Sequence, residues 1–168
     1  TTLISGPTNL KINENIKLIK VETAEEMFQA TQQNLPADIA IFSAAVTDFK
    51  INKKNTQKIK KSDNLTINLE KNIDILNFIS NHNSMRPKLV IGFAAETNNV
   101  EENASIKLVN KNCDWIIAND VSKIDSGFES DYNEVTIHYK NDKKEKLAHR
   151  KKSEISEEIV DRIVNLMN

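Results

Sequence analysis

Three short stretches of this sequence place small residues beside side chains that can bind phosphate or a cation. They are residues 43–48 (SAAVTD), 93–97 (FAAET) and 119–122 (NDVS). Asp48 in the first stretch is the candidate Mg²⁺ ligand, because magnesium that bridges phosphates is usually held by one or two carboxylates. A lysine-rich segment follows, in which Lys58 begins the run KIKK and could neutralise a polyphosphate. An acid followed by a basic segment indicates a phosphate-bearing ligand.

Each of these residues also has a purely structural interpretation. Asp48 could cap a turn, and a run of lysines is usually a solvated surface. Lys107 and Lys111 are four residues apart and share one face of a predicted helix, where they could form a cationic clamp or a solvated stripe. Phe93 could stack against a base, although filling the core is the commoner use of an aromatic residue. Residue types and spacing alone reach a nucleotide or phosphate ligand and go no further.

The candidate stretches follow apolar segments that are predicted to be strands. Residues 39–43, 89–94 and 114–118 are almost continuously apolar, as expected of strands buried in a parallel sheet. Ligands bind beyond the carboxyl ends of such strands, which is where the three stretches lie. A capping box, Thr23 with Glu26, predicts a helix over 23–34. The other predicted elements are strands at 2–5, 17–22 and 65–69, helices at 100–111 and after caps Asn72 and Ser153, and a hairpin of 134–139 with 146–149.

The alternation of strands and helices predicts the fold class α/β. We expect a three-layer, Rossmann-like sandwich with a mostly parallel sheet, helices on both faces and a C-terminal antiparallel hairpin arm. The 168 residues suffice for one domain, and 23 basic against 24 acidic residues provide no net field toward nucleic acid or a membrane surface. With no bilayer-length apolar run and no signal-peptide pattern, a cytoplasmic protein is expected. The single Cys113 excludes an intrachain disulfide and is expected to fill the core.

The amino-acid sequences of several segments resemble those of one family, phosphopantothenate cysteine ligase. In bacteria this ligase is commonly the C-terminal half of a bifunctional protein whose other half is a flavin-dependent decarboxylase. The resemblance runs almost the whole length of the chain. The segments that carry it are LISGP (3–7), SAAVTDF (43–49), KIKK (58–61), KNIDIL (71–76), GFAAET (92–97), ANDVS (118–122) and FESDYN (128–133).

The resemblance implies a reaction and roles for individual residues. The family joins 4′-phosphopantothenate to cysteine through an acyl cytidylate, using CTP and Mg²⁺, and forms homodimers through an arm that the 134–149 hairpin resembles. Lys58 matches a catalytic lysine on a flap, and Asp48 matches the acid near the triphosphate and metal. The implied nucleotide-binding residues are Ser43, Ala44, Asp48, Lys58, Ile73, Asp74, Ile75, Leu76, Phe93, Lys107 and Lys111, and possible further pocket residues are Ala45, Asn119 and Asp120.

The sequence departs from the family at its front. Family members begin with a further strand, a glycine-rich phosphate-binding turn and a helix, together with an asparagine that stabilises the acyl cytidylate. We therefore expect a single ligase-type domain over residues 1–168 that either follows a further segment or binds nucleotide without turnover. Two alternatives stay open. They are a nicotinamide-dependent reductase, although three glycines form no GxGxxG motif, and a non-catalytic nucleotide-binding dimerisation module.

Overall fold

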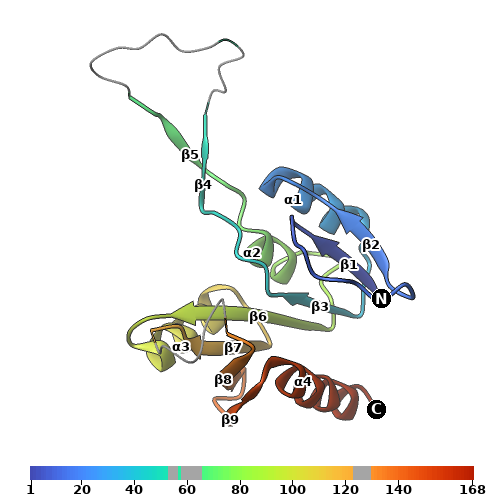
Figure 1. Cartoon of the computed structure of the whole chain (residues 1–168), viewed down its shortest axis with the longest axis vertical. Helices are drawn as coiled ribbons and strands as arrows, with labels where there is room; N and C mark the ends of the chain where they lie inside the picture. The colour runs from blue at the N-terminus through green and yellow to red at the C-terminus, as the bar shows by residue number, and fades with distance from the viewer. Residues whose placement is uncertain (53–56, 58–65, 123–129) are drawn as a thin grey trace.

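A computed structural model describes residues 1–52, 57, 66–122 and 130–168. Within these ranges strands and helices alternate through the middle of the chain, as the sequence predicts (Figure 1). No helix among the described residues is long and apolar enough to cross a membrane. The elements are β1 (Thr2–Ser5), β2 (Lys17–Lys20), α1 (Ala24–Gln33), β3 (Ile39–Phe42), β4 (Phe49–Ile51), β5 (Leu69–Lys71), α2 (Ile75–Ser80), β6 (Leu89–Glu96), α3 (Val100–Asn110), β7 (Trp115–Asp120), β8 (Tyr132–Tyr139), β9 (Lys144–Lys151) and α4 (Lys152–Met167).

The main sheet has the strand order β3-β6-β7-β8-β9 in the described part of the chain. β3, β6 and β7 are parallel, with Phe42 opposite Gly92 and Glu96 opposite Asp120. β8 and β9 form the predicted antiparallel hairpin, which pairs with β7 and so continues the main sheet. Because β3, β6 and β7 run the same way, their carboxyl ends lie at one edge, where the three candidate stretches begin.

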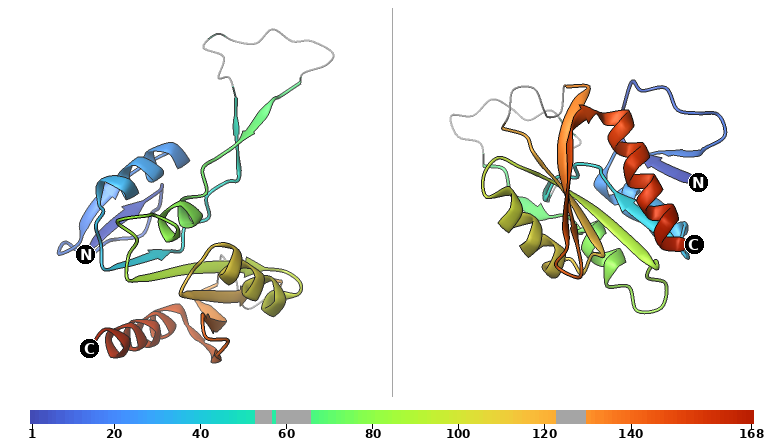
Figure 2. Two further views of the ribbon diagram at one scale, coloured as in Figure 1. Left: turned by 180° about the vertical axis from the view of Figure 1, so that it is seen from behind. Right: turned by 90° about the horizontal axis from the view of Figure 1, so that it is seen from below.

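Helices cover both faces of the sheet, which confirms the three-layer prediction (Figure 2). On one face α4 buries Ile155, Ile159 and Ile163 against large side chains of the strands, among them Ile91 and Trp115. On the other face α3 and α2 pack over a layer of mostly smaller residues. The core on this face contains Ala104 and Leu108 of α3 together with Val90, Ala94, Cys113, Ile116 and Ala118, with Leu76 and Phe42 beside them.

β1 and β2 form a separate two-stranded parallel sheet, with α1 packed against β1. The predicted capping box of α1 is present, since Glu26 N donates to Thr23 Oγ1 at 3.2 Å and Thr23 N donates to Glu26 Oε2 at 3.1 Å. α1 meets α2 through an edge-to-face contact between Phe28 and Phe78, whose ring centroids are 4.9 Å apart. This contact joins the small sheet's helix to the α2 layer of the main sheet.

β4 and β5 form an antiparallel ribbon that projects from the body of the molecule (Figure 1). The strand predicted at 65–69 is wrong in its position, because the observed β5 begins at Leu69, where that residue pairs with Ile51. Phe49, Ile51 and Leu69 lie on one face of the ribbon and are 52%, 50% and 58% exposed. The other face carries an ion pair of 3.5 Å between Lys50 and Glu70.

Two predicted helix caps are also wrong. α2 is capped by Asp74 instead of Asn72, because the Asn72 side chain donates to Thr47 O at 2.8 Å. α4 begins one residue before Ser153, and the backbone N–H of Lys151 donates to the carboxylate of Glu154 at 3.1 Å. Both differences move a boundary by one or two residues and leave the helices themselves as predicted.

Candidate functional site

The loop after β3 is tied directly to the segment that leads into α2. Asn72 N donates to Asp48 O at 2.8 Å, and Asn72 Nδ2 donates to Thr47 O at 2.8 Å. These bonds bring residues 43–48 beside residues 72–76, although they are far apart in the sequence. Ser43, Ala44 and Ala45 are exposed there, so a ligand can approach their backbone. The resemblance of both segments to the family is the sequence signal that they belong to one site. From its residue type alone, Asn72 was expected only to cap a helix.

Asp74 connects this segment to α3. Its Oδ1 accepts from Asn77 N at 2.9 Å and caps α2, while its Oδ2 forms an ion pair with Lys111. Burial acts to raise the pKa of the Asp74 carboxyl, but the hydrogen bonds from Lys111 and Asn77 and the charges of Lys111 and Lys107 outweigh it, so its pKa is lowered. The carboxylate therefore stays ionised and holds the Lys111 ammonium beside the first turn of α2.

Lys107 reaches the middle of β6, next to the level at which β3 ends, where its Nζ donates to Phe93 O at 3.0 Å. The Phe93 ring packs against the core on the α4 face, on the opposite side of the sheet from α2 and α3. This arrangement follows from strand alternation, because Ile91 and Phe93 point to one face while Gly92 and Ala94 point to the other. The expected stacking of a base on the Phe93 ring therefore does not fit the α3 side of the sheet. On that side Phe93 offers only its carbonyl oxygen.

Asp48 lies at the start of the ribbon with an exposed side chain. Its carboxylate forms no hydrogen bond or ion pair with another described residue. One exposed carboxylate is a suitable ligand for magnesium, which keeps several waters and takes few protein ligands. Among the described residues, no three His, Cys, Asp or Glu side chains are gathered to hold a metal ion by themselves. The role of Asp48 as a metal ligand stays a prediction.

The other predicted residues are placed less closely. Asn119 and Asp120 end β7, next to β6 in the sheet, and Asp120 Oδ1 accepts from Ser122 N at 3.0 Å in a local turn. They lie at the same sheet edge as the β3 loop, on the far side of β6. Ile75 is buried and Leu76 half-buried, so both support α2, whereas Ile73 is exposed. Lys58 lies outside the described residues.

A cavity of about 380 Å³ lies elsewhere, between α3 and the β8–β9 turn, and none of the predicted site residues lines it. The candidate site is instead a surface of exposed groups. Ser43, Asp48 and Ile73 are exposed on one side, and Lys111 with Asp74 forms the other. Such a surface can present backbone and two ammonium groups to an anionic ligand.

The fold and the site together define a Rossmann-like α/β domain with its polar groups gathered at the carboxyl edge of a parallel sheet. A family model described as the C-terminal domain of DNA/pantothenate metabolism flavoprotein matches residues 1–167. The chain belongs to this family.

Curated relatives give the same result. The chain is 41% identical over 165 residues to the coenzyme A biosynthesis bifunctional protein CoaBC of Haemophilus influenzae, covering 97% of the chain and 40% of that protein. It is 40% identical over 168 residues to the CoaBC of Escherichia coli K12, covering 97% of the chain and 41% of that protein. The chain thus spans about two fifths of the length of these relatives.

Solved structures agree with the sequence relatives. The crystal structure of the C-terminal domain of CoaBC superposes with a TM-score of 0.79 at 33% identity, over 99% of this chain and 74% of that one. A DNA/pantothenate metabolism flavoprotein from Streptococcus pneumoniae shares the fold, with a TM-score of 0.78 at 21% identity over 98% of this chain and 80% of that one. The resemblance to the C-terminal domain of the bifunctional coenzyme A biosynthesis protein, first seen in the sequence, is confirmed.

Proposed function

We propose that this chain is a phosphopantothenate cysteine ligase domain, which joins 4′-phosphopantothenate to cysteine with CTP in coenzyme A biosynthesis. The observation that carries the proposal is that residues 43–48 meet residues 72–76 beyond the carboxyl end of β3, while Lys111 pairs with Asp74 and Lys107 bonds to Phe93 O nearby in β6. An open α/β sheet binds its ligand at this edge. The names of the relatives, which refer to coenzyme A biosynthesis, support the same assignment.

Lys107 and Lys111 supply the positive charge for the nucleotide. Each ammonium already has an internal acceptor, Phe93 O for Lys107 and the Asp74 carboxylate for Lys111. When nucleotide oxygens replace these acceptors, both ammonium groups stay hydrogen-bonded, so binding exchanges charge-assisted hydrogen bonds without leaving a buried charge unpaired. The exposed backbone of residues 43–45 is free to approach the base and ribose.

The proposed reaction has two displacement steps. A carboxylate oxygen of 4′-phosphopantothenate attacks the α-phosphorus of CTP, the bond to the β-phosphate breaks, and pyrophosphate leaves with the electron pair. The cysteine amine then attacks the acyl carbon, CMP leaves, and the nitrogen loses a proton to give the amide. Negative charge develops on phosphoryl oxygens in the first step and on the carbonyl oxygen in the second, so both steps gain from a cation held at the same place.

We assign that cation to Lys58, which follows Asp48 by ten residues in the segment joining β4 to β5. Asp48 is proposed to hold Mg²⁺ through its exposed carboxylate. Bound magnesium would offset the negative charge of the triphosphate. The Asn72 bonds to the backbone of residues 47 and 48 fix the position of this carboxylate relative to α2.

The direct test is the release of pyrophosphate from CTP, Mg²⁺, 4′-phosphopantothenate and cysteine. The reaction is run with the chain alone and with a chain extended at its N-terminus by the glycine-rich segment of the family. Pyrophosphate release that depends on 4′-phosphopantothenate, with amide formation that depends on cysteine, is the expected result. An extended protein that is folded and releases no pyrophosphate would contradict the proposal.

A second test separates catalysis from folding at Lys58. Lys58→Gln removes the charge and should lower kcat by about a hundredfold or more, as for other groups that stabilise developing charge. Lys88→Gln is the matched control, because Lys88 is an exposed lysine paired with Asp38 at the opposite edge of the sheet. The control should keep full activity. Equal losses of stability and activity in Lys58→Gln would make the residue structural.

We further propose that the chain forms a homodimer. The 134–149 hairpin, which resembles the family's dimer arm, continues the main sheet as β8 and β9, so we assign the contact to the β4–β5 ribbon instead. A ribbon with three residues in each strand is not stable on its own, and its exposed apolar face offers a surface for a second copy. Ile51→Asp should shift the molar mass in light scattering from dimer to monomer, whereas Lys50→Ser on the opposite face should not. A wild-type monomer at micromolar concentration would refute dimer formation.

We also propose that a flavin-dependent decarboxylase domain is fused to this domain or associates with it in the cytoplasm. The relatives are bifunctional proteins and are about two and a half times longer than the matched region. Copurification of a flavin-containing partner with the tagged chain, expressed in its own host, is the expected observation.

A further inference from the structure

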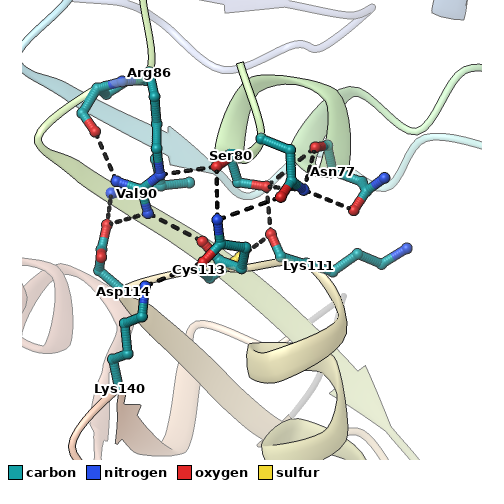
Figure 3. Close-up of polar contacts among 11 residues, drawn as sticks. Asn77, Ser80, Arg86, Val90, Lys111, Cys113, Asp114 and Lys140 are labelled. Carbon is teal, nitrogen blue, oxygen red and sulfur yellow. Dashed lines mark hydrogen bonds and ion pairs between the residues drawn. The ribbon is translucent and has the colours of Figure 1, made fainter. Parts of the chain in front are cut away.

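Arg86 joins the ends of the two helices that carry the candidate nucleotide residues. Its guanidinium donates four hydrogen bonds (Figure 3): Nε to Ser80 O at 2.8 Å, Nη1 to Pro87 O at 2.9 Å, and Nη2 to Asn112 O at 3.0 Å and to Asp114 Oδ2 at 2.9 Å. Asp114 Oδ2 also accepts from Val90 N at 2.7 Å. A planar guanidinium can satisfy several acceptors at once, which a lysine cannot.

These bonds fix the C-terminal end of α3. The last carbonyls of a helix have no donor within the helix, so they need partners elsewhere. Here Lys111 O accepts from the fully buried Ser80 hydroxyl, and Asn112 O accepts from Arg86. Asn112 itself takes a left-handed conformation with φ of 49°, and its Nδ2 donates to Ser80 O at 3.2 Å. The end of α3 is therefore attached to the end of α2.

This attachment fixes the position of Lys111. Its backbone is held by Ser80, at the C-terminal end of α2, while its ammonium pairs with Asp74, at the N-terminal end of the same helix. We infer that Arg86 is a positioning residue of the nucleotide site, which sets the spacing of α2 and α3 and thereby the place where Lys111 meets the ligand. This inference rests on the proposed nucleotide-binding function and extends it to a residue outside the family motifs recognised in the sequence.

Arg162 provides a matched control for Arg86. The two side chains are almost equally exposed, at 26% and 25%. Arg162 also makes several hydrogen bonds, with Nε donating to Glu145 Oε1 at 3.0 Å and Nη1 donating to Glu158 O at 2.7 Å. It lies on α4, on the other face of the sheet, so its loss should lower stability without touching α2 or α3.

The experiment measures the dissociation constant of CTP with Mg²⁺ by calorimetry, at a temperature where every variant stays folded. Arg86→Met should raise Kd by about tenfold, the effect of losing one charge-assisted hydrogen bond at the ligand. Arg162→Met should change Kd by less than about twofold, because distant sites act independently. Arg86→Lys should resemble Arg86→Met, since the charge returns without the forked geometry.

Three outcomes overturn the inference or its basis. An unchanged Kd in Arg86→Met, or equal changes in Arg86→Met and Arg162→Met, overturns the positioning role. If Arg86→Met does not fold, Ser80→Ala decides, because the hydroxyl bond to Lys111 O is the one bond of this side chain that joins α2 to the end of α3, and its other bonds, to Asn77 O and from Asn81 Nδ2, stay within the end of α2. A Kd raised about threefold supports the inference and an unchanged Kd overturns it. A wild-type protein that does not bind CTP contradicts the proposed function itself.

Discussion

Replacement of Gly92 by alanine tests how closely α2 packs on the sheet. A Cβ at this position would lie 2.8 Å from Ile116 Cδ1 and 2.8 Å from Leu76 Cδ2, well inside van der Waals contact. Ile116 is fully buried, so the half-buried Leu76 in the first turn of α2 must move. Overpacking costs about 1–3 kcal/mol, and alanine recovers about 0.5–1 kcal/mol relative to glycine in a strand. We expect Gly92→Ala to lower the free energy of unfolding by about 1–2 kcal/mol.

Urea unfolding followed by the fluorescence of Trp115, the one tryptophan in the sequence, measures this loss. With an m-value of about 1–3 kcal/mol/M, the midpoint should fall by roughly 0.5–1 M. The same substitution in a Leu76→Ala background is the control, because the shorter side chain relieves the contact. There Gly92→Ala should cost at least about 0.5 kcal/mol less, which is a measurable coupling between neighbours. An equal cost in both backgrounds would refute the packing argument.

Three further predictions concern titratable groups. Burial, followed by the charge of the adjacent aspartate, raises the pKa of the Cys113 thiol to about 11, so this thiol should not react with a disulfide reagent at pH 8 until the protein unfolds; fast reaction of folded protein would contradict its burial. Hydrogen bonds, first of all from Arg162, lower the pKa of Glu145, so its stabilisation is present above the unfolded value near 4.5 and is lost as the pH falls through the lower folded value. Glu145→Gln should therefore cost up to about 1 kcal/mol at pH 7 and flatten the acid limb of stability, and an unchanged acid limb would count against it. Asp74→Asn keeps the capping oxygen and should be about 1 kcal/mol more stable than Asp74→Ala in thermal unfolding; equal stabilities would show that the cap does not matter.

The elements that sequence reasoning located well are those with local signals. The capping box predicted α1 at 23–34, and the helix spans Ala24–Gln33. Continuous apolar runs predicted β6 and β7, which extend two residues beyond the predicted 89–94 and 114–118. Strand pairing lengthens them, because Glu96 and Asp120 pair with each other at the end of the ladder. Burial on both faces is visible in the sequence, whereas the end of a ladder depends on the neighbouring strand.

The errors arise where a distant partner decides the conformation. Asn72 has a side chain that can cap a helix, but its amide donates to Thr47 O, 25 residues away in the sequence. Asp74 becomes the cap instead. The strand predicted at 65–69 shifts to 69–71, because its register is fixed by pairing with β4, which alternation alone does not reveal. Neither partner can be read from a window of adjacent residues.

The candidate site was predicted in part. The resemblance to the family named Asp74, Lys107 and Lys111, and in the structure Lys111 pairs with Asp74 while Lys107 donates to Phe93 O. It did not show that the Phe93 ring belongs to the core, because that depends on which face of β6 meets α4. Arg86 lies in none of the motifs recognised in the sequence. Its four acceptors, three of them backbone carbonyls, exist only once the fold has formed.

The unequal residue sizes on the two faces of the main sheet bear on how the protein can evolve. The α4 face is filled by long aliphatic side chains, which exchange for one another at small cost when total volume is kept. The opposite face has Ala94, Ala118 and Gly92 among its larger residues, and at these small positions almost any substitution adds volume and pushes α2 or α3 outward. Genetic drift should therefore accumulate on the α4 side with little effect on ligand affinity, while the α3 side stays nearly fixed in any lineage that needs the site.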